Sequence, residues 1–267
     1  MNNTKVIVGF SGGAGSYIAA KRAVERFGKD SVTLLFYDTM TEDEDLYRFI
    51  DDAERVLGAR LVRLCDGRNI WQLFRDERFL GNNRVPVCSR KLKGEVADRY
   101  WKEHGTPDTF SVLGIDWTEK HRAKRMERLI TDRKFWFPLC EPPYLTKKQM
   151  FAKIESDGIS VPRLYSVGAP HNNCGGGCVR AGHAHFRWLF QQLPCVFAEW
   201  ERQEQLLRDE LGDVSILKDR RGGESRTMTL RQLREKLEDQ PLLFADAEWG
   251  GCGCFTEADT DAVKENL

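Results

Sequence analysis

The feature that most constrains the fold is the stretch of residues 6–28, VIVGFSGGAGSYIAAKRAVERFG. An apolar run leads there through a serine- and glycine-rich turn into a helical pattern, and Gly28 offers a stop for that helix. The apolar side chains that fall on one helical face are Tyr17, Ile18, Ala20, Val24 and Phe27. A buried strand, a tight turn and a helix in this order predict a βα unit.

Two further apolar segments extend this pattern. Residues 32–38 and 109–116 resemble the short buried strand at 5–10, and helical patterns lie between them. This alternation is typical of a parallel, twisted sheet with helices on both faces, so an α/β fold is expected. The acidic run at 42–45 follows the second strand, where carboxylates favour the start of a helix.

The second half of the chain has a different texture. Residues 138–170 are rich in proline and aromatic residues and predict a helical hairpin, and polar helices are expected at about 182–211 and 229–239. A length of 267 residues suffices for one substantial α/β domain and a smaller region. We therefore expect an α/β domain at 1–145 and a mostly helical, cysteine-containing region at 146–267.

Overall charge excludes a global attraction to polyanions. Lys and Arg total 41 and Asp and Glu total 41, so no net field favours nucleic acid or a membrane surface. Residues 119–134 are locally basic, however, and a nucleic-acid acceptor stays open. No signal-like or membrane-spanning apolar stretch occurs, which predicts a cytoplasmic protein without a membrane partner.

The turn after the first strand predicts an anion site. Glycines permit positive φ and the close approach of a ligand, while backbone N–H groups and the positive end of the helix dipole attract phosphate. The residues concerned are Ser11, Gly12, Gly13, Gly15 and Ser16. Neither the P-loop pattern nor the dinucleotide glycine fingerprint matches this string.

The string does resemble the PP-loop, Ser-Gly-Gly-x-x-Ser, of the ATP pyrophosphatase and adenine-nucleotide α-hydrolase-like superfamily. Further segments resemble its PAPS reductase-like branch, within which this chain would be a divergent member. They are DTMTEDEDLYRF (38–49), VPVCSRKLKGEV (85–96), LGIDWTEKHRAKR (113–125) and PRLYSVGAPHNNCGGGC (162–178). Together with the loop they span roughly residues 6–180 in the expected order.

The resemblance implies roles for individual residues. The loop from Ser11 to Ser16 would hold the pyrophosphate of ATP, or the sulfate or phosphate of a sulfonucleotide. Asp38 and Thr39 would lie near the ribose or adenine, and Gly114 would let the nucleotide approach the third predicted strand. Ser11, Ser16, Arg122 and Arg125 are the expected catalytic residues, the two arginines reaching a phosphate or the partner substrate.

Two departures from the family pattern stand out. Many ATP-using members have Asp where this chain has Gly15, and many reductases have Arg where it has Asp116. Magnesium at the phosphates would then depend on Asp38 or Asp116, which offer the oxygen ligands that this ion prefers.

Closely spaced cysteines predict a metal or cluster site. Cys174 and Cys178 bracket three glycines, and Cys252 and Cys254 bracket Gly253, so the two pairs supply four thiolates. The resemblance favours an iron–sulfur cluster, with zinc as the alternative and Cys88 as an alternative ligand. The histidines that could substitute are His171, His183 and His185. The remaining cysteines, Cys65, Cys140 and Cys195, are expected to pack as small apolar residues.

Three functions follow from the resemblance. The first is an ATP α-hydrolase that forms AMP and pyrophosphate and adenylates or thiolates an unknown acceptor. The second is a PAPS or APS reductase with a carboxyl-terminal cysteine nucleophile, although the Glu and His that flank that cysteine in reductases are missing around GGCGCF. The third is a nucleotide-binding accessory module of a phage or defence system. A homodimer stays open in each case.

Overall fold

A computed structural model describes residues 4–219, 224–244, 247 and 249–250. The described chain divides into two compact units. The first comprises the residues up to Asp38, Glu42–Asp66 and Glu95–Asn173, and the second comprises Thr39–Thr41, Gly67–Gly94 and the residues from Cys174 on. Cys252 and Cys254 lie outside the described residues.

The first unit is built on a five-stranded parallel sheet in the order β3-β2-β1-β4-β5. Its strands are β1 (Val6–Gly9), β2 (Val32–Asp38), β3 (Arg60–Cys65), β4 (Phe110–Leu113) and β5 (Lys134–Trp136). The expected α/β class and the three expected strands are confirmed, and β3 and β5 are additional edge strands. In register, Gly9 lies opposite Leu35 of β2 and Leu113 of β4.

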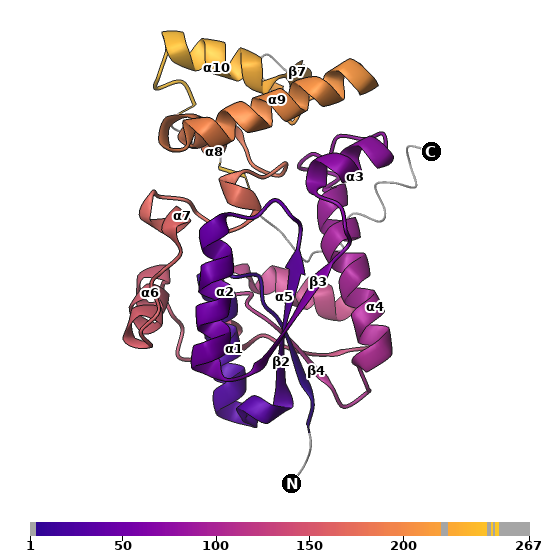
Figure 1. Cartoon of the computed structure of the whole chain (residues 1–267), viewed down its shortest axis with the longest axis vertical. Helices are drawn as coiled ribbons and strands as arrows, with labels where there is room; N and C mark the ends of the chain where they lie inside the picture. Colours follow the sequence, from indigo (N-terminus) through magenta and orange to yellow (C-terminus); the bar gives the residue numbers. More distant parts are fainter. Residues whose placement is uncertain (1–3, 220–223, 245–246, 248, 251–267) are drawn as a thin grey trace. The chain divides into compact units, whose positions relative to one another are not determined.

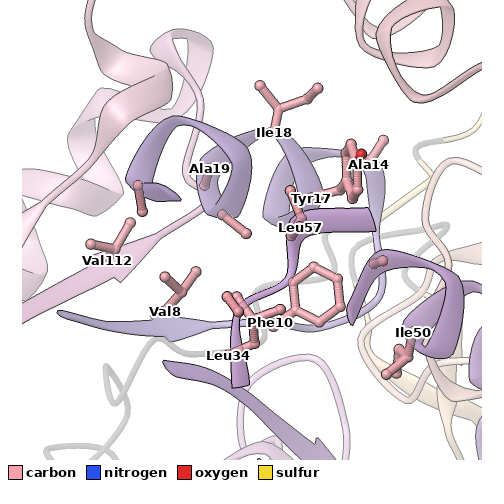
Figure 2. Packing of buried hydrophobic residues seen from close by; sticks show 14 of the residues in the cluster. Val8, Phe10, Ala14, Tyr17, Ile18, Ala19, Leu34, Ile50, Leu57 and Val112 are labelled. Atoms are coloured by element: carbon pink, nitrogen blue, oxygen red, sulfur yellow. The ribbon is translucent and has the colours of Figure 1, made fainter. Parts of the chain in front are cut away.

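Helices cover both faces of this sheet. The helices α1 (Ala14–Phe27) and α2 (Glu44–Leu57) lie on one side, and α4 (Glu95–His104) lies on the other (Figure 1). Val8, Leu34 and Val112, which are paired in register across β1, β2 and β4, project from the strands towards α1, where they meet small and aromatic side chains of the helix (Figure 2). This core fixes the position of α1 above β1 and β4.

The segment after the sheet packs on α1. Met150 and Ile154 of α6 (Lys147–Ser156) belong to the same core as α1. Asp157, just after α6, accepts a hydrogen bond from Tyr17 Oη at 2.7 Å and pairs with Lys21 Nζ at 2.6 Å. Residues 146–173 therefore belong to the first unit, and the carboxyl-terminal segment of the second unit begins at Cys174.

Short helices complete the first unit. They are α5 (Lys120–Leu129), α7 (Arg163–Ser166) and the 3₁₀ turns Lys29–Ser31, Trp117–Glu119 and Pro138–Cys140.

The second unit is mostly helical, as expected for the cysteine-containing region. It contains α3 (Ile70–Asp76), a π-helical turn (Ser89–Gly94), a 3₁₀ turn (Cys174–Gly176), α8 (His183–Gln192), α9 (Pro194–Leu211), the antiparallel strands β6 (Leu217–Asp219) and β7 (Arg226–Met228), and α10 (Leu230–Asp239). The helix expected at 182–211 is two helices, because Pro194 cannot continue α8 and instead begins α9.

A buried aromatic cluster and a buried carboxylate hold the second unit together. The Trp200 ring lies 4.8 Å from that of Trp71 and 5.7 Å from that of Phe186. Glu204 accepts hydrogen bonds from the backbone N–H of Ile216 at 2.9 Å and of Leu230 at 2.6 Å. None of the described helices has the length and apolar character needed to cross a bilayer.

Candidate anion site at the switch point of the sheet

The strand order places a switch point between β1 and β4. The chain runs outward from β1 through β2 to β3, and then returns to the other side of β1 with β4. In open α/β sheets, ligands bind outside the carboxyl ends of the strands at such a point. The loop after β1 and the loop after β4 both begin there, and these loops hold most of the residues that the sequence predicted for the nucleotide.

Glycine is required within the β1–α1 loop. Gly12 has φ of +75°, a conformation that residues with side chains rarely adopt, and a Cβ there would lie 2.9 Å from Leu46 Cγ. Gly13 is the N-cap of α1 and has no side chain to cap the helix. Among the described residues, the N–H groups of Gly15 and Ser16 in the first turn have no acceptor. Free N–H donors and the positive end of a helix dipole favour an anion, so anion binding at this loop stays a prediction.

The two loop serines lie together. Ser16 Oγ donates to the carbonyl oxygen of Gly13 at 2.8 Å, and Ser11 Oγ lies 3.4 Å from Ser16 Oγ. The predicted catalytic pair is therefore gathered at the start of α1. Both hydroxyl groups are neutral donors, which suits the binding of a phosphate oxygen.

Gly114 meets the same helix turn. A Cβ on Gly114 would lie 2.8 Å from both the Gly15 carbonyl carbon and the Ser16 nitrogen. Such a distance is essentially never seen, so the first turn of α1 can rest on the end of β4 only because position 114 is glycine; a Cβ on Gly15 would lie 3.1 Å from the Gly114 carbonyl oxygen, which is a tight contact. In this structure the missing side chain admits the helix, while an approach of the nucleotide to Gly114 stays a prediction.

Tyr165 and Asn172 contact the loop and were not assigned by the sequence analysis. Tyr165 Oη accepts a hydrogen bond from the N–H of Ala14 at 3.2 Å. Asn172, only 2% exposed, donates from Nδ2 to the Gly12 carbonyl oxygen at 2.9 Å, while its buried Oδ1 has no partner in the described structure. Both residues lie in the stretch PRLYSVGAPHNNCGGGC, but no local pattern in that stretch indicates their contacts with the loop.

Salt bridges position Tyr165. Arg163 forms a bidentate salt bridge with Asp43: the distances from Nε to Oδ1 and from Nη2 to Oδ2 are both 2.9 Å. The N–H of Arg163 also donates to Asp45 Oδ2 at 2.7 Å. Asp43 is itself the N-cap of α2, as the acidic run predicted. The start of α7 is thereby fixed to α2 at Arg163, two residues before Tyr165.

Lys147 adds a cation beside Tyr165. Its Nζ lies 5.0 Å from the centre of the Tyr165 ring and donates to the carbonyl oxygen of Pro170. Desolvation lowers the pKa of Lys147, and the negative charge of Asp116 opposes that shift. No sequence pattern indicates a role for this residue, because a lysine in the first turn of a surface helix is ordinary.

Two carboxylates flank the loop. Asp38 ends β2 and accepts a hydrogen bond from Tyr47 Oη at 2.9 Å, which contributes to a raised pKa of Tyr47 after the larger effect of burial. Asp116 follows β4 and accepts from the N–H of Thr118 at 2.8 Å. Leu35, Gly9 and Leu113 are paired in register across β2, β1 and β4. Asp38, Gly12 and Asp116 each come three residues after one of them, so all three lie at the carboxyl-terminal edge of the sheet. Thr39, next to Asp38, is buried.

The two predicted arginines lie on α5. Arg122 pairs with Glu119, and its Nε is buried without a partner in the described structure. Arg125 is exposed. Only Ala123 and Met126 of α5 are buried, against Leu113, Ile115 and Phe137. Phosphate contacts by the two arginines stay a prediction.

The described cysteines do not form a metal centre. Cys174 is buried with φ of +52°, and the backbone continues through positive φ at Gly175 and Gly176. Cys178 Sγ accepts from the N–H of Arg180 at 3.4 Å. Within the part of the chain that the structure describes, no three metal-ligating side chains gather. A four-thiolate site would need Cys252 and Cys254, so we derive no chemistry from a cluster.

Other predicted ligands have different surroundings. His185 is buried, its Nε2 lies 2.7 Å from the Gly176 carbonyl oxygen, and burial lowers its pKa. Cys88 is partly buried just before the π-helical turn. The packing role expected for Cys65 and Cys195 is wrong, because both are exposed; β3 is an edge strand and Cys195 lies in the first turn of α9. Cys140 is partly buried against the α5 core.

Comparisons with known proteins give limited matches. Searched against models of protein families, the chain matches none. It is 28% identical over 124 residues to an uncharacterized protein of Methanocaldococcus jannaschii, a match that covers 46% of this chain and 25% of that protein. The chain thus spans about a quarter of the length of this relative.

Among solved structures, the chain is similar to a phosphoadenylyl-sulfate (PAPS) reductase from Candida auris in complex with phosphate. The TM-score is 0.44 and the sequence identity 14%, over 63% of this chain and 79% of that chain.

Proposed function

We propose that the chain is an ATP-binding enzyme of the PP-loop type, which cleaves ATP to AMP and pyrophosphate. The observation that carries this proposal is the β1–α1 loop at the switch point, where a glycine turn and two serines lie at the start of a helix and the N–H groups of Gly15 and Ser16 have no acceptor among the described residues. A site of this kind binds a large anion without a lysine of the P-loop type. The five matched sequence segments favour an adenine nucleotide as the source of that anion.

The loop suits the leaving group of the reaction. An oxygen of water or of an acceptor attacks the α-phosphorus, the bond from that phosphorus to the bridging oxygen breaks, and pyrophosphate leaves. With water as the nucleophile, its proton passes to solvent and AMP is the second product. Negative charge grows on the pyrophosphate as it departs, and the N–H groups of Gly15 and Ser16, the serine hydroxyls and the Lys147 ammonium would stabilise it.

Magnesium fits the donors at this edge of the sheet. Asp38 ends β2 and Asp116 follows β4, the two strands that neighbour β1, and carboxylate oxygen is the ligand type that magnesium takes in phosphate sites. When bound, the ion would neutralise phosphate charge. The hydrogen bonds of Tyr47 and Thr118 to these carboxylates would orient them.

Sulfonucleotide reduction is the second candidate, because the same concavity would accept a sulfate or phosphate group. Its nucleophile would be Cys252 or Cys254, in the stretch that lacks the flanking Glu and His of reductases. An accessory role in binding a nucleotide without cleaving it would also use this loop.

The test is chromatography of nucleotides after incubation of anaerobically purified protein with magnesium and ATP. The double variant Ser11→Ala, Ser16→Ala is expected to lose AMP and pyrophosphate formation. Ser31→Ala is the matched control, since Ser31 precedes β2 at the opposite end of the sheet. Equal AMP formation by the double variant and the control would refute the proposed role of the loop.

Incubation with PAPS and a thiol reductant provides the second arm. Release of sulfite with ATP left intact would replace the first candidate with the second. Binding of ATP without turnover of either nucleotide would favour the accessory role.

A further inference from the structure

Two large aromatic side chains are exposed together at the end of β4. Trp117 opens the 3₁₀ turn after the strand, and Tyr144 lies between the turn at Pro138–Cys140 and α6. Their ring centres are 5.7 Å apart, and they are 42% and 47% exposed. Single exposed aromatic residues are ordinary, but a neighbouring pair offers a flat apolar surface to a ligand.

The backbone on either side of this pair is anchored. Asp116 accepts hydrogen bonds from the N–H and Oγ1 of Thr118, at 2.8 and 2.5 Å, and so fixes the turn of Trp117. Arg22 of α1 donates to the carbonyl oxygens of Pro138, Glu141 and Pro143, just before Tyr144. Leu145, just after it, is buried in the core. Both rings are thus exposed from rigid segments, which reduces the entropy lost when a ligand binds.

A row of cations starts at the aromatic pair. Lys120 Nζ lies 5.1 Å from the centre of the Tyr144 ring and 3.5 Å from its Oη. Lys120, Lys124 and Arg128 are four residues apart on α5, so they line one helix face over about 12 Å. All three are exposed, and within the described chain neither Lys124 nor Arg128 has an ion pair. The helix carries five basic residues and one acidic residue, Glu127.

We propose that Trp117, Tyr144 and this cation row bind a single-stranded nucleic acid, which is the acceptor of the proposed reaction. This inference rests on the proposed function, because Trp117 directly follows Asp116 at the edge of the sheet where the nucleotide would bind. Unpaired bases stack on exposed aromatic rings, and regularly spaced cations follow the phosphates. A duplex keeps its bases stacked inside, so it would gain the charge contacts alone.

The acceptor site can be tested by fluorescence anisotropy with a fluorescein-labelled, 12-nucleotide single-stranded RNA of mixed sequence. Trp117→Ala and Tyr144→Ala should each weaken binding about 5- to 150-fold, the range expected when one base loses its stacking partner. Phe79→Ala is the matched control, because Phe79 is a similarly exposed aromatic residue, at 38%, that belongs neither to the pair nor to the cation row. Its affinity should equal that of the wild type.

Salt dependence tests the cation row separately. For single strands, the slope of log K against log salt is about −0.7 for each phosphate neutralised, so the double variant Lys124→Ala, Arg128→Ala should lose about 1.4 from the slope. An unlabelled single-stranded DNA of the same sequence competes in parallel, and the tighter of the two strands identifies the acceptor chemistry. An unchanged salt slope in the double variant Lys124→Ala, Arg128→Ala would overturn the proposal. Unchanged affinity for the single strand in both Trp117→Ala and Tyr144→Ala would also overturn it.

Two further arms separate this inference from the proposed function. An RNA duplex of the same sequence should bind more weakly than the single strand, and equal or tighter binding would rule out stacking. ATP affinity, measured by calorimetry, should be unchanged in Trp117→Ala and Tyr144→Ala. If it falls with them, the pair stacks the adenine and the acceptor site is wrong. If RNA binding fails while AMP forms, the acceptor site alone is wrong.

Discussion

The contact between Gly114 and the first turn of α1 gives the sharpest prediction. In Gly114→Ala, the added Cβ would lie 2.8 Å from two backbone atoms, the Gly15 carbonyl carbon and the Ser16 nitrogen. Neither atom belongs to a flexible side chain, so the helix turn itself must move away from β4. An overpacked site of this kind typically loses about 1–3 kcal/mol of stability. The displaced turn carries the N–H groups assigned to the anion.

Gly28→Ala provides a control at the opposite end of the same helix. Gly28 has φ of +78° and ψ of 146°, and an added Cβ would meet nothing within 4 Å. The substitution therefore adds backbone strain of about 1–3 kcal/mol without a clash. Both variants should show a similar fall in the free energy of unfolding, but only Gly114→Ala should disturb the anion site.

Urea denaturation and calorimetric titration with pyrophosphate measure the two effects. Loss of one hydrogen bond to a charged ligand costs about 1.5–3 kcal/mol, so Gly114→Ala should bind pyrophosphate about 10- to 150-fold more weakly. Gly28→Ala should bind it as the wild type does. If Gly114→Ala loses stability but keeps its affinity for pyrophosphate, the α1 turn does not form the anion site, and the reasoning is refuted.

Three further substitutions probe other contacts. Asn172→Asp removes the donor to the Gly12 carbonyl and adds negative charge near the loop. The affinity for pyrophosphate in the same titration should therefore fall at least tenfold. Asn172→Ala removes the donor alone, so the difference in affinity between the two variants measures the effect of the added charge. Lys147→Met should raise the KM for ATP in AMP formation, and unchanged kinetics would remove Lys147 from the site. Burial raises the pKa of Glu204 from 4.5 to about 6, so between these two pH values folding is accompanied by uptake of a proton. The stability that this protonation provides is lost as the pH rises through the pKa of the folded protein. The stability of the wild type relative to Glu204→Gln should therefore fall by about 2 kcal/mol as the pH rises from 4 to 7 in urea titrations, and a difference that stays constant with pH would contradict the raised pKa.

The fold class could be predicted because the central strands have a simple pattern. β1, β2 and β4 are buried on both faces and therefore appear as continuous apolar runs. The edge strands give a weaker signal. Arg60 and Arg63 interrupt β3, where one side of the strand is open to solvent, and β5 has only three residues. Local patterns detect strands that the sheet surrounds and miss strands at its edges.

The loop residues of the candidate site were predictable for the same local reason. A glycine turn between a strand and a helix is contiguous in sequence, and Ser11 and Ser16 are only five residues apart. Tyr165 and Asn172 are more than 150 residues from the atoms that they contact, so no local pattern reveals them. Their positions depend on how α6 packs on α1 and how Arg163 binds Asp43. Such contacts exist only after the tertiary fold has formed.

Strand order is the step that joins these local predictions into one site. The sequence places Asp38 and Asp116 at the ends of two separate predicted strands, and nothing in it says that both strands neighbour β1. Because the order is β3-β2-β1-β4-β5, the loops after β2 and β4 flank the anion loop from opposite sides. Any other position of β4 in the sheet would separate Gly114 from Gly15 and leave the first turn of α1 without its support. The close contact between Gly114 and Gly15 is thus a consequence of the strand order, and its meaning can be read from the sequence only once the position of β4 in the sheet is known.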